Sequence, residues 1–111
     1  MSTTDIGNAA EQAASEELAR QGFEILERNW KTKWCEVDII ARKDNVVWFI
    51  EVKYRSTIEF GDGLEYIGPK KLRHLHIAAD LWVCQHDYQD EYTLGAVSVS
   101  QNNIIGTMIE I

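Results

Sequence analysis

The chain has 111 residues, a length at which one domain is usual, and we expect residues 1–111 to form a single domain. Its 45% hydrophobic content and single proline exclude a disordered chain, and no apolar run approaches the roughly 20 residues of a membrane span. The net charge of -7 argues against a generally basic nucleic-acid binder, but residues 42–76 hold seven Lys and Arg against five acids, and the remainder holds four against thirteen. An anionic partner would therefore meet the middle of the chain.

The first thirty residues lack the pattern of a secretory signal, because a polar start leads into an Ala- and Glu-rich stretch. We therefore expect a cytoplasmic protein with no membrane partner. In that reducing compartment the two cysteines, Cys35 and Cys84, are expected to be free thiols.

The first predicted element is a helix over residues 6–21, with Thr4 or Asp5 as its N-cap and Gly22 as its stop. Its apolar stripe consists of small residues and one leucine, which suits close packing on a sheet. The stripe is Ala10, Ala13, Ala14 and Leu18.

Three strands are predicted next, over residues 23–31, 35–42 and 46–54. The third is apolar on both faces as far as Glu51, which is typical of a central strand covered on both sides. The segment 57–66 contains two glycines and is expected to be a loop.

A second helix is predicted from Pro69 to about residue 85, because proline suits the first turn and an apolar stripe follows. Two strands, 92–100 and 104–111, complete the chain, joined by a turn at 101–103. The stripe consists of Leu72, Leu75, Ala79, Trp82 and Val83. The order αβββαββ indicates an α/β (α+β) domain with a mixed sheet.

The most informative feature is the spacing of Asp38, Glu51 and Lys53. Asp44-Asn45 suits a two-residue hairpin turn, which would pair residue 43 with residue 46. That register places Asp38 opposite Glu51 and residue 36 opposite Lys53, with Lys53 on the same strand face as Glu51.

Two carboxylates opposed on a buried strand pair repel each other, unless one takes a proton or a cation lies between them. Mg²⁺ or Mn²⁺ suits such oxygen ligands, and a nearby lysine could orient a water or steady charge on a phosphate. Two alternatives stay open: a surface hairpin on which Asp38 and Glu51 are solvated, and a buried Glu–Lys ion pair with no ligand.

A helix, a hairpin that carries the acids and a second helix together resemble the PD-(D/E)xK, or restriction-endonuclease-like, nuclease superfamily and, within it, the small bacterial YraN-like family. The resemblance covers about residues 7–82. Its matching residues are Gly7, Glu11, Ala14, Leu18, Gly22, Ile25-Leu26, Arg28-Asn29, Glu36 to Ala41, Phe49 to Arg55, Phe60-Gly61, Lys71, Leu75 and Ala79. Cys35 and Ala10 depart from it, since the family usually has glycine at both places.

The resemblance implies a restriction-endonuclease-like fold in which Asp38 and Glu51 hold a metal with the Val52 carbonyl. Lys53 would position the attacking water, and Glu11 would approach from the first helix as an auxiliary acid. Wheel position alone does not select Glu11, because Glu17 lies nearer the centre of the apolar stripe. A solvated helix acid is the alternative for Glu11.

Four basic residues are candidates for nucleic-acid contact. Arg55 follows on the Glu51 face and would meet a phosphate, unless it is a surface arginine. Lys70, Lys71 and Arg73 crowd a helix start where the helix dipole disfavours cations, which indicates an anion nearby or a solvated basic turn.

The expected function is that of a Mg²⁺- or Mn²⁺-dependent endonuclease that hydrolyses DNA phosphodiester bonds, with branched or single-stranded DNA as substrate and repair or recombination as context. The alternatives are a non-catalytic module that binds nucleic acid or protein, and a subunit whose 104–111 strand pairs with a partner or a second copy. The four tryptophans favour core or interface roles, and Trp34, in a turn, is the candidate for base stacking.

Overall fold

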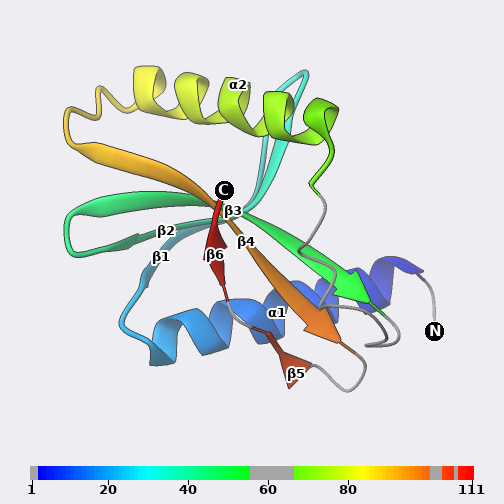
Figure 1. The fold of residues 1–111 in the computed structure, drawn as a ribbon. Helices are drawn as coiled ribbons and strands as arrows, with labels where there is room; N and C mark the ends of the chain where they lie inside the picture. Colours follow the sequence, from blue (N-terminus) through cyan, green and yellow to red (C-terminus); the bar gives the residue numbers. More distant parts are fainter. Residues whose placement is uncertain (1–2, 56–66, 101–103, 107) are drawn as a thin grey trace.

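The computed structural model describes residues 3–55, 67–100, 104–106 and 108–111, so the predicted loop 57–66 and turn 101–103 lie outside the described residues. The elements are α1 (Thr3–Arg20), β1 (Glu24–Lys31), β2 (Glu36–Lys43), β3 (Val46–Arg55), α2 (Pro69–Gln85), β4 (Glu91–Ser100), β5 (Ile104–Ile105) and β6 (Ile109–Glu110). The α/β class, the order of elements from α1 to β4 and the second helix are confirmed (Figure 1).

The strands form one mixed sheet in the order β1-β2-β3-β4-β5, with β6 also paired to β4. Neighbouring strands are antiparallel except β3 and β4, which run parallel and are linked through α2. The position of β3 between β2 and β4 confirms the prediction of a central strand.

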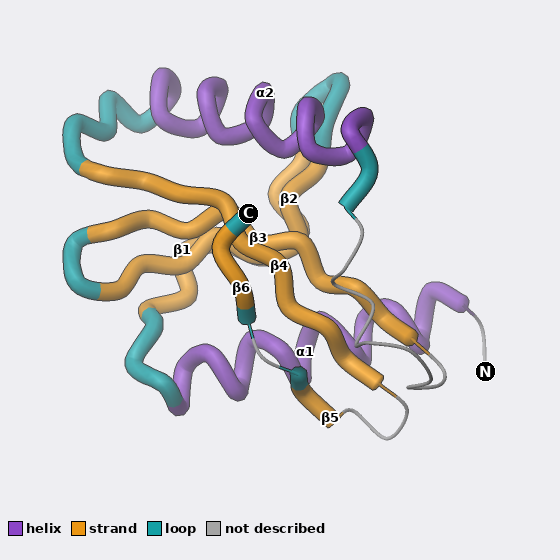
Figure 2. Tube along the Cα trace, in the orientation of Figure 1, coloured by secondary structure: helices purple, strands orange, loops and turns teal. Residues whose placement is uncertain are grey.

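The two helices cover opposite faces of the sheet (Figure 2). Ala10, Ala14 and Leu18 of α1 pack on one face, where their small size lets the helix lie close to the strands. The stripe of α2 packs on the other face, around Phe49 and Trp82. Each face of β3 is therefore buried against a helix.

The end of α1 follows its sequence signal, whereas its beginning does not. Gly22 has a φ of 99°, and the Phe23 N–H donates to the Leu18 carbonyl at 3.0 Å, which together form the usual glycine-terminated helix end. The predicted N-cap is wrong: α1 starts at Thr3, so Thr4 and Asp5 lie inside the helix. A first helical turn can leave its N–H groups to water and needs no side-chain cap.

The predicted single strand 104–111 is also wrong, because it is broken into β5 and β6. Ile105 pairs with Val99 and Ile109 with Ala96, so the register changes by one residue between the two segments. At the break the Gly106 N–H donates to the Ser98 carbonyl at 2.8 Å, and a Cβ at Gly106 would collide with the Ser98 hydroxyl. Glycine avoids this clash without any movement of the Ser98 side chain.

Cys35 is buried and Cys84 exposed, and both are free thiols. Within the described residues, neither α1 nor α2 offers a stretch long and apolar enough to span a bilayer.

Candidate active site

The hairpin of β2 and β3 has the predicted register. Asp44 and Asn45 have φ values of 53° and 65°, and Lys43 pairs with Val46 across the two-residue turn. The ladder continues in this register as far as Ile39 and Ile50. Asp38 and Glu51 are thus the next residues of the two strands beyond the end of the ladder.

At Asp38 the side chain replaces the backbone as the hydrogen-bond acceptor for β3. The Val52 N–H donates to Asp38 Oδ2 at 2.8 Å, so the carboxylate supplies an acceptor to β3 where the backbone ladder has stopped. The predicted pair of Glu36 with Lys53 is wrong, because it needed the ladder to run on. Glu36 instead pairs with Lys31 of β1, with 3.6 Å between Lys31 Nζ and Glu36 Oε2.

Glu51 lies two residues after Phe49, on the α2 side of the sheet, and is 7% exposed. Lys71, in the first turn of α2, places its Nζ 2.9 Å from Glu51 Oε2. Asp38 is 8% exposed, so the alternative of a solvated hairpin is excluded for both acids.

Burial raises the pKa of Asp38 above its ordinary value. The Val52 N–H, then the positive charges of Lys71 and Lys53, oppose that rise. Lys53 is partly buried. The buried Asp38 carboxyl therefore interacts with the positive charges of Lys53 on β3 and Lys71 on α2. Two cationic side chains thus already act on the predicted site.

Glu11, on α1, lies near enough to Asp38 for their charges to interact. Its Oε1 atom is buried and has no hydrogen-bond partner among the described residues. Burial, then the negative charges of Asp38 and Glu36, raise the pKa of Glu11 from 4.5 to about 7. The alternative of a solvated helix acid is thereby excluded. Glu17, in contrast, accepts hydrogen bonds from Arg20 and Gln21 along the helix surface.

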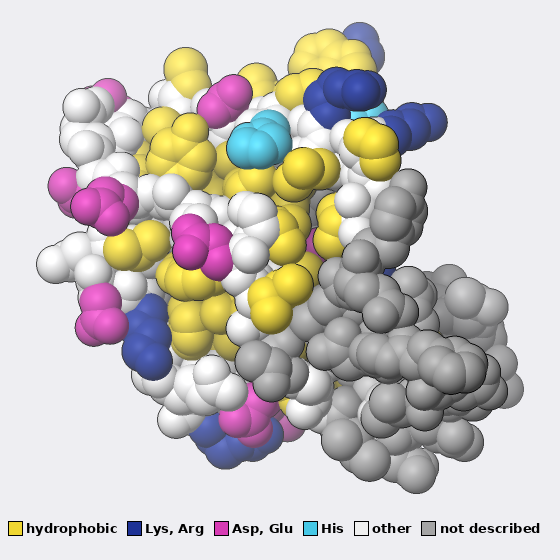
Figure 3. All heavy atoms as spheres, in the orientation of Figure 1, with side chains coloured by type: hydrophobic (Ala, Val, Ile, Leu, Met, Phe, Trp, Pro, Cys, Tyr) yellow, Lys and Arg dark blue, Asp and Glu magenta, His cyan; other side chains and the backbone are white. Residues whose placement is uncertain are grey.

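The basic residues at the start of α2 separate into two groups. Lys71 turns inward to Glu51, while Lys70 and Arg73 are exposed, and Figure 3 shows Lys and Arg side chains gathered over this end of α2. The crowding of cations at a helix start indicated an anion nearby, and for Lys71 that anion is the protein's own Glu51. The Arg55 backbone belongs to β3, but its side chain lies outside the described residues.

The sequence did not predict the Lys71–Glu51 pair, which joins residues on separate elements. The only sequence signal for this pair was the crowding of cations at the start of α2, where the helix dipole disfavours positive charge. The pair matches part of the second alternative, a buried Glu–Lys ion pair, although with Lys71 in place of Lys53. Cys35 and Ala10, the two departures from the family pattern, are buried in the clusters on the α2 and α1 faces respectively.

The donor set fits a hard divalent cation that keeps much of its water shell. No group of three His, Cys, Asp or Glu side chains in the described part of the chain is arranged to hold a metal ion. Asp38 and Glu51 supply at most two carboxylates, which is the number that Mg²⁺ commonly takes from a protein, with waters and substrate oxygens completing its shell.

Comparison with known proteins places the chain in a family. Residues 10–99 match the family described as "Uncharacterised protein family UPF0102". The chain belongs to this family, which is the YraN-like family. The matched segment includes Glu11, Asp38, Glu51 and Lys71.

Individual relatives agree with this assignment. The chain is 41% identical over 90 residues to a UPF0102 protein of Fusobacterium nucleatum, covering 81% of this chain and 76% of the relative. It is 43% identical over 83 residues to a UPF0102 protein of Caldicellulosiruptor saccharolyticus, covering 75% and 70%. A UPF0102 protein of Vibrio vulnificus is 41% identical over 83 residues, covering 75% and 68%.

Proposed function

We propose that this protein is a cytoplasmic Mg²⁺- or Mn²⁺-dependent nuclease that hydrolyses DNA phosphodiester bonds. The observation that carries the proposal is the burial of two carboxyl groups, Asp38 and Glu51, at the point where the backbone ladder between their strands ends. Burying acids is costly, and perturbed ionisable groups collect at functional sites.

The surroundings of the carboxyl groups favour a cation. Glu11 adds a third acid whose Oε1 is buried without a partner among the described residues, and its burial, then negative charge from Asp38, raises its pKa. A divalent ion held by Asp38, Glu51 and the Val52 carbonyl would offset this repulsion. When bound, such an ion lowers the pKa of a coordinated water and neutralises charge on a phosphate.

The chain's own residues take the remaining roles. Asp38 fixes the path of β3 by accepting a hydrogen bond from the Val52 N–H at Oδ2, which leaves Oδ1 as the oxygen that would bind the metal. Lys53 orients the water that attacks phosphorus, or steadies the charge that develops on the phosphate. Glu11, with a pKa near neutrality, can hold or release a proton at working pH.

The Lys71–Glu51 ion pair supports a second candidate function. With Nζ 2.9 Å from Oε2, Lys71 already neutralises Glu51, and a scaffold that needs no metal would look the same. The net charge of -7 also favours a non-catalytic module that binds protein or nucleic acid. In the nuclease, Lys71 would leave Glu51 when a divalent ion binds and would then face the phosphate.

A cleavage assay separates the two functions. Single-stranded, duplex, flap and four-way DNA are incubated with Mg²⁺ or Mn²⁺ and with wild type, Asp38→Asn, Lys53→Ala or Glu91→Gln. Glu91 is a matched control because it is an exposed acid on β4 that pairs with Val46, at the far end of β3 from Glu51.

We expect wild type and Glu91→Gln to cleave, and the Asp38 and Lys53 variants to lose at least roughly 100-fold in rate. Equal cleavage by all four proteins would reveal a contaminating nuclease. Binding of DNA without cleavage under every condition would favour the non-catalytic module.

A further inference from the structure

The turn between β1 and β2 presents a large apolar side chain to solvent. Trp34 is 70% exposed, the highest value among the exposed large hydrophobic residues that the structure describes. An indole of this size normally gains stability from burial, so its exposure on a surface suggests a partner.

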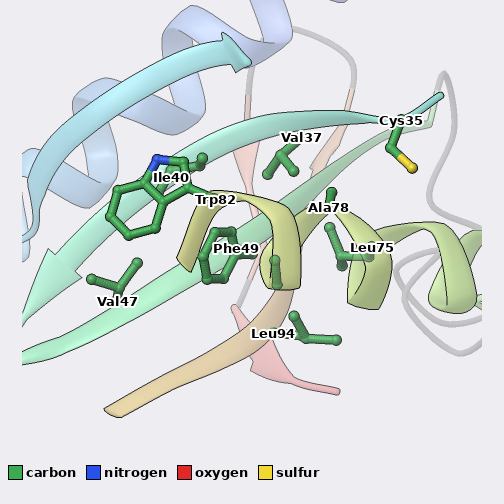
Figure 4. Close-up of a cluster of buried hydrophobic side chains, with 10 residues drawn as sticks. Cys35, Val37, Ile40, Val47, Phe49, Leu75, Ala78, Trp82 and Leu94 are labelled. Carbon is green, nitrogen blue, oxygen red and sulfur yellow. The ribbon is translucent and has the colours of Figure 1, made fainter. Parts of the chain in front are cut away.

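The turn that carries Trp34 is well ordered by hydrogen bonds. Thr32 N–H donates to the Cys35 carbonyl at 2.7 Å, and Thr32 Oγ1 accepts from the backbone N–H groups of Trp34 at 3.1 Å and Cys35 at 2.9 Å. The buried Cys35 then anchors the turn in the cluster on the α2 face, at the far end from Trp82 (Figure 4). The indole is thus held on a fixed support.

A cavity of about 380 Å³ lies between this turn and the start of α2. Its lining comprises Lys31, Thr32, Lys33, Trp34, Cys35, Glu36, Lys71 and His74. Lys71 belongs to both the cavity and the candidate active site, because its Nζ lies 2.9 Å from Glu51 Oε2. Among the residues that line the cavity, Lys71 is thus the link to the proposed catalytic residues.

The charges that line the cavity suit a phosphate joined to an aromatic ring. Three lysines face one acid, Glu36, which Lys31 already engages. The Lys33 ammonium lies over the Trp34 ring, 5.8 Å from its centroid, so a cation and a largely exposed indole occupy the same place on the surface. Proteins that bind single strands combine a backbone-tracking cation with an aromatic platform in this way.

We propose that the β1–β2 turn and the start of α2 form a subsite for an unpaired nucleotide beside the scissile phosphate. The base stacks on Trp34, while Lys33 and Lys71 meet the phosphates on either side. A base inside a duplex is already stacked on its neighbours, so the subsite selects single-stranded or unpaired segments. This inference rests on the proposed nuclease function and names its substrate class.

Fluorescence anisotropy without divalent ions tests the subsite apart from catalysis. The probes are fluorescein-labelled oligodeoxythymidine, oligouridine, an abasic strand and a duplex, all of equal length. The proteins are wild type, Trp34→Ala, Trp34→Phe and Tyr92→Ala. Tyr92 is a matched control, because it is an exposed aromatic residue that pairs with Val47 at the other end of β3.

We expect Trp34→Ala to weaken binding of the thymidine strand roughly ten-fold or more, and Trp34→Phe to keep most of the affinity. Binding of the abasic strand and the duplex should not depend on Trp34, and Tyr92→Ala should match wild type. The uridine strand shows whether the subsite accepts ribose as well, and a loss confined to base-bearing single strands supports the proposal for either sugar.

Unchanged affinity in Trp34→Ala, or an equal loss on the abasic strand and the duplex, would overturn the subsite. Asp38-dependent cleavage would survive that result, so the two failures are distinguishable. If wild type binds none of the four probes, the subsite is overturned, while the cleavage assay with Mg²⁺ or Mn²⁺ tests the nuclease proposal separately.

Discussion

From Val46 to Ile50, β3 is joined to β2 by a continuous backbone ladder, whereas at Val52 it is joined through the carboxylate of Asp38. The first half presents apolar side chains to the cores on both faces, including Phe49 and Ile50. The second half buries Glu51 and meets charges from α1, β2 and α2. One strand thus combines an apolar half that stabilises the fold with a half that buries ionisable side chains at a cost in stability.

The largest effect on stability is expected in the ladder half of β3, from Val46 to Ile50. Phe49 is fully buried and makes edge-to-face contacts with Trp82 and Tyr92, with ring centroids 5.6 and 5.8 Å away. Figure 4 shows it at the centre of the cluster. Phe49→Ala should lower the free energy of unfolding by about 3–5 kcal/mol in urea denaturation. A loss below about 1 kcal/mol would mean that this half does not dominate stability.

The second-largest effect on stability is expected in the charged half of β3, which contains Glu51. Lys71→Met leaves Glu51 buried without its cation and should lower the free energy of unfolding by about 1–2 kcal/mol, reduced by the partial exposure of Lys71. Adding Glu51→Gln to Lys71→Met should restore most of that stability. If the double variant is no more stable than Lys71→Met alone, the ion pair is not what the lysine contributes.

A smaller, pH-dependent effect is expected at Glu11. Since folding raises its pKa from 4.5 to about 7, the folded state binds the proton more tightly, and stability falls as pH rises through that window. Glu11→Gln removes this penalty. It should match wild type at pH 4.5 and exceed it by about 1 kcal/mol above pH 7, after allowance for solvent screening. A pH-independent difference in urea denaturation would contradict this.

The smallest effect is expected for an exposed pair. Lys31 and Glu36 have 3.6 Å between charged atoms and side-chain exposures of 68% and 45%, in contrast to the buried carboxylate of Glu51. Lys31→Ala should change the free energy of unfolding by less than about 0.5 kcal/mol. A loss as large as that of Lys71→Met would remove the distinction between the buried and exposed ion pairs.

The sequence predicted the ladder half well and the charged half only in part. Asp44-Asn45 fixed the register, because two residues with positive φ allow one hairpin geometry. The apolar periodicity and Pro69 located α2 at Pro69–Gln85. These are local properties, and neighbouring residues are enough to determine them.

Where contacts join distant elements, sequence patterns were a weaker guide. It did not predict that the ladder ends at Ile39 or that Lys71 reaches Glu51, because both depend on how β2, β3 and α2 pack. The broken last strand depends on the close approach of Gly106 to Ser98. Glu11 was identified through the family resemblance, and its burial against Asp38 became visible only in the fold.

The most direct test of a cation site at the charged end of β3 is a calorimetric titration with Mn²⁺ of wild type, Asp38→Asn and Glu91→Gln in the absence of DNA. We expect one site in wild type and in Glu91→Gln with equal affinity, and at least a roughly ten-fold weaker affinity in Asp38→Asn. Equal Mn²⁺ binding by all three proteins, or no binding by any, would contradict the proposal that the buried carboxyl groups hold a metal.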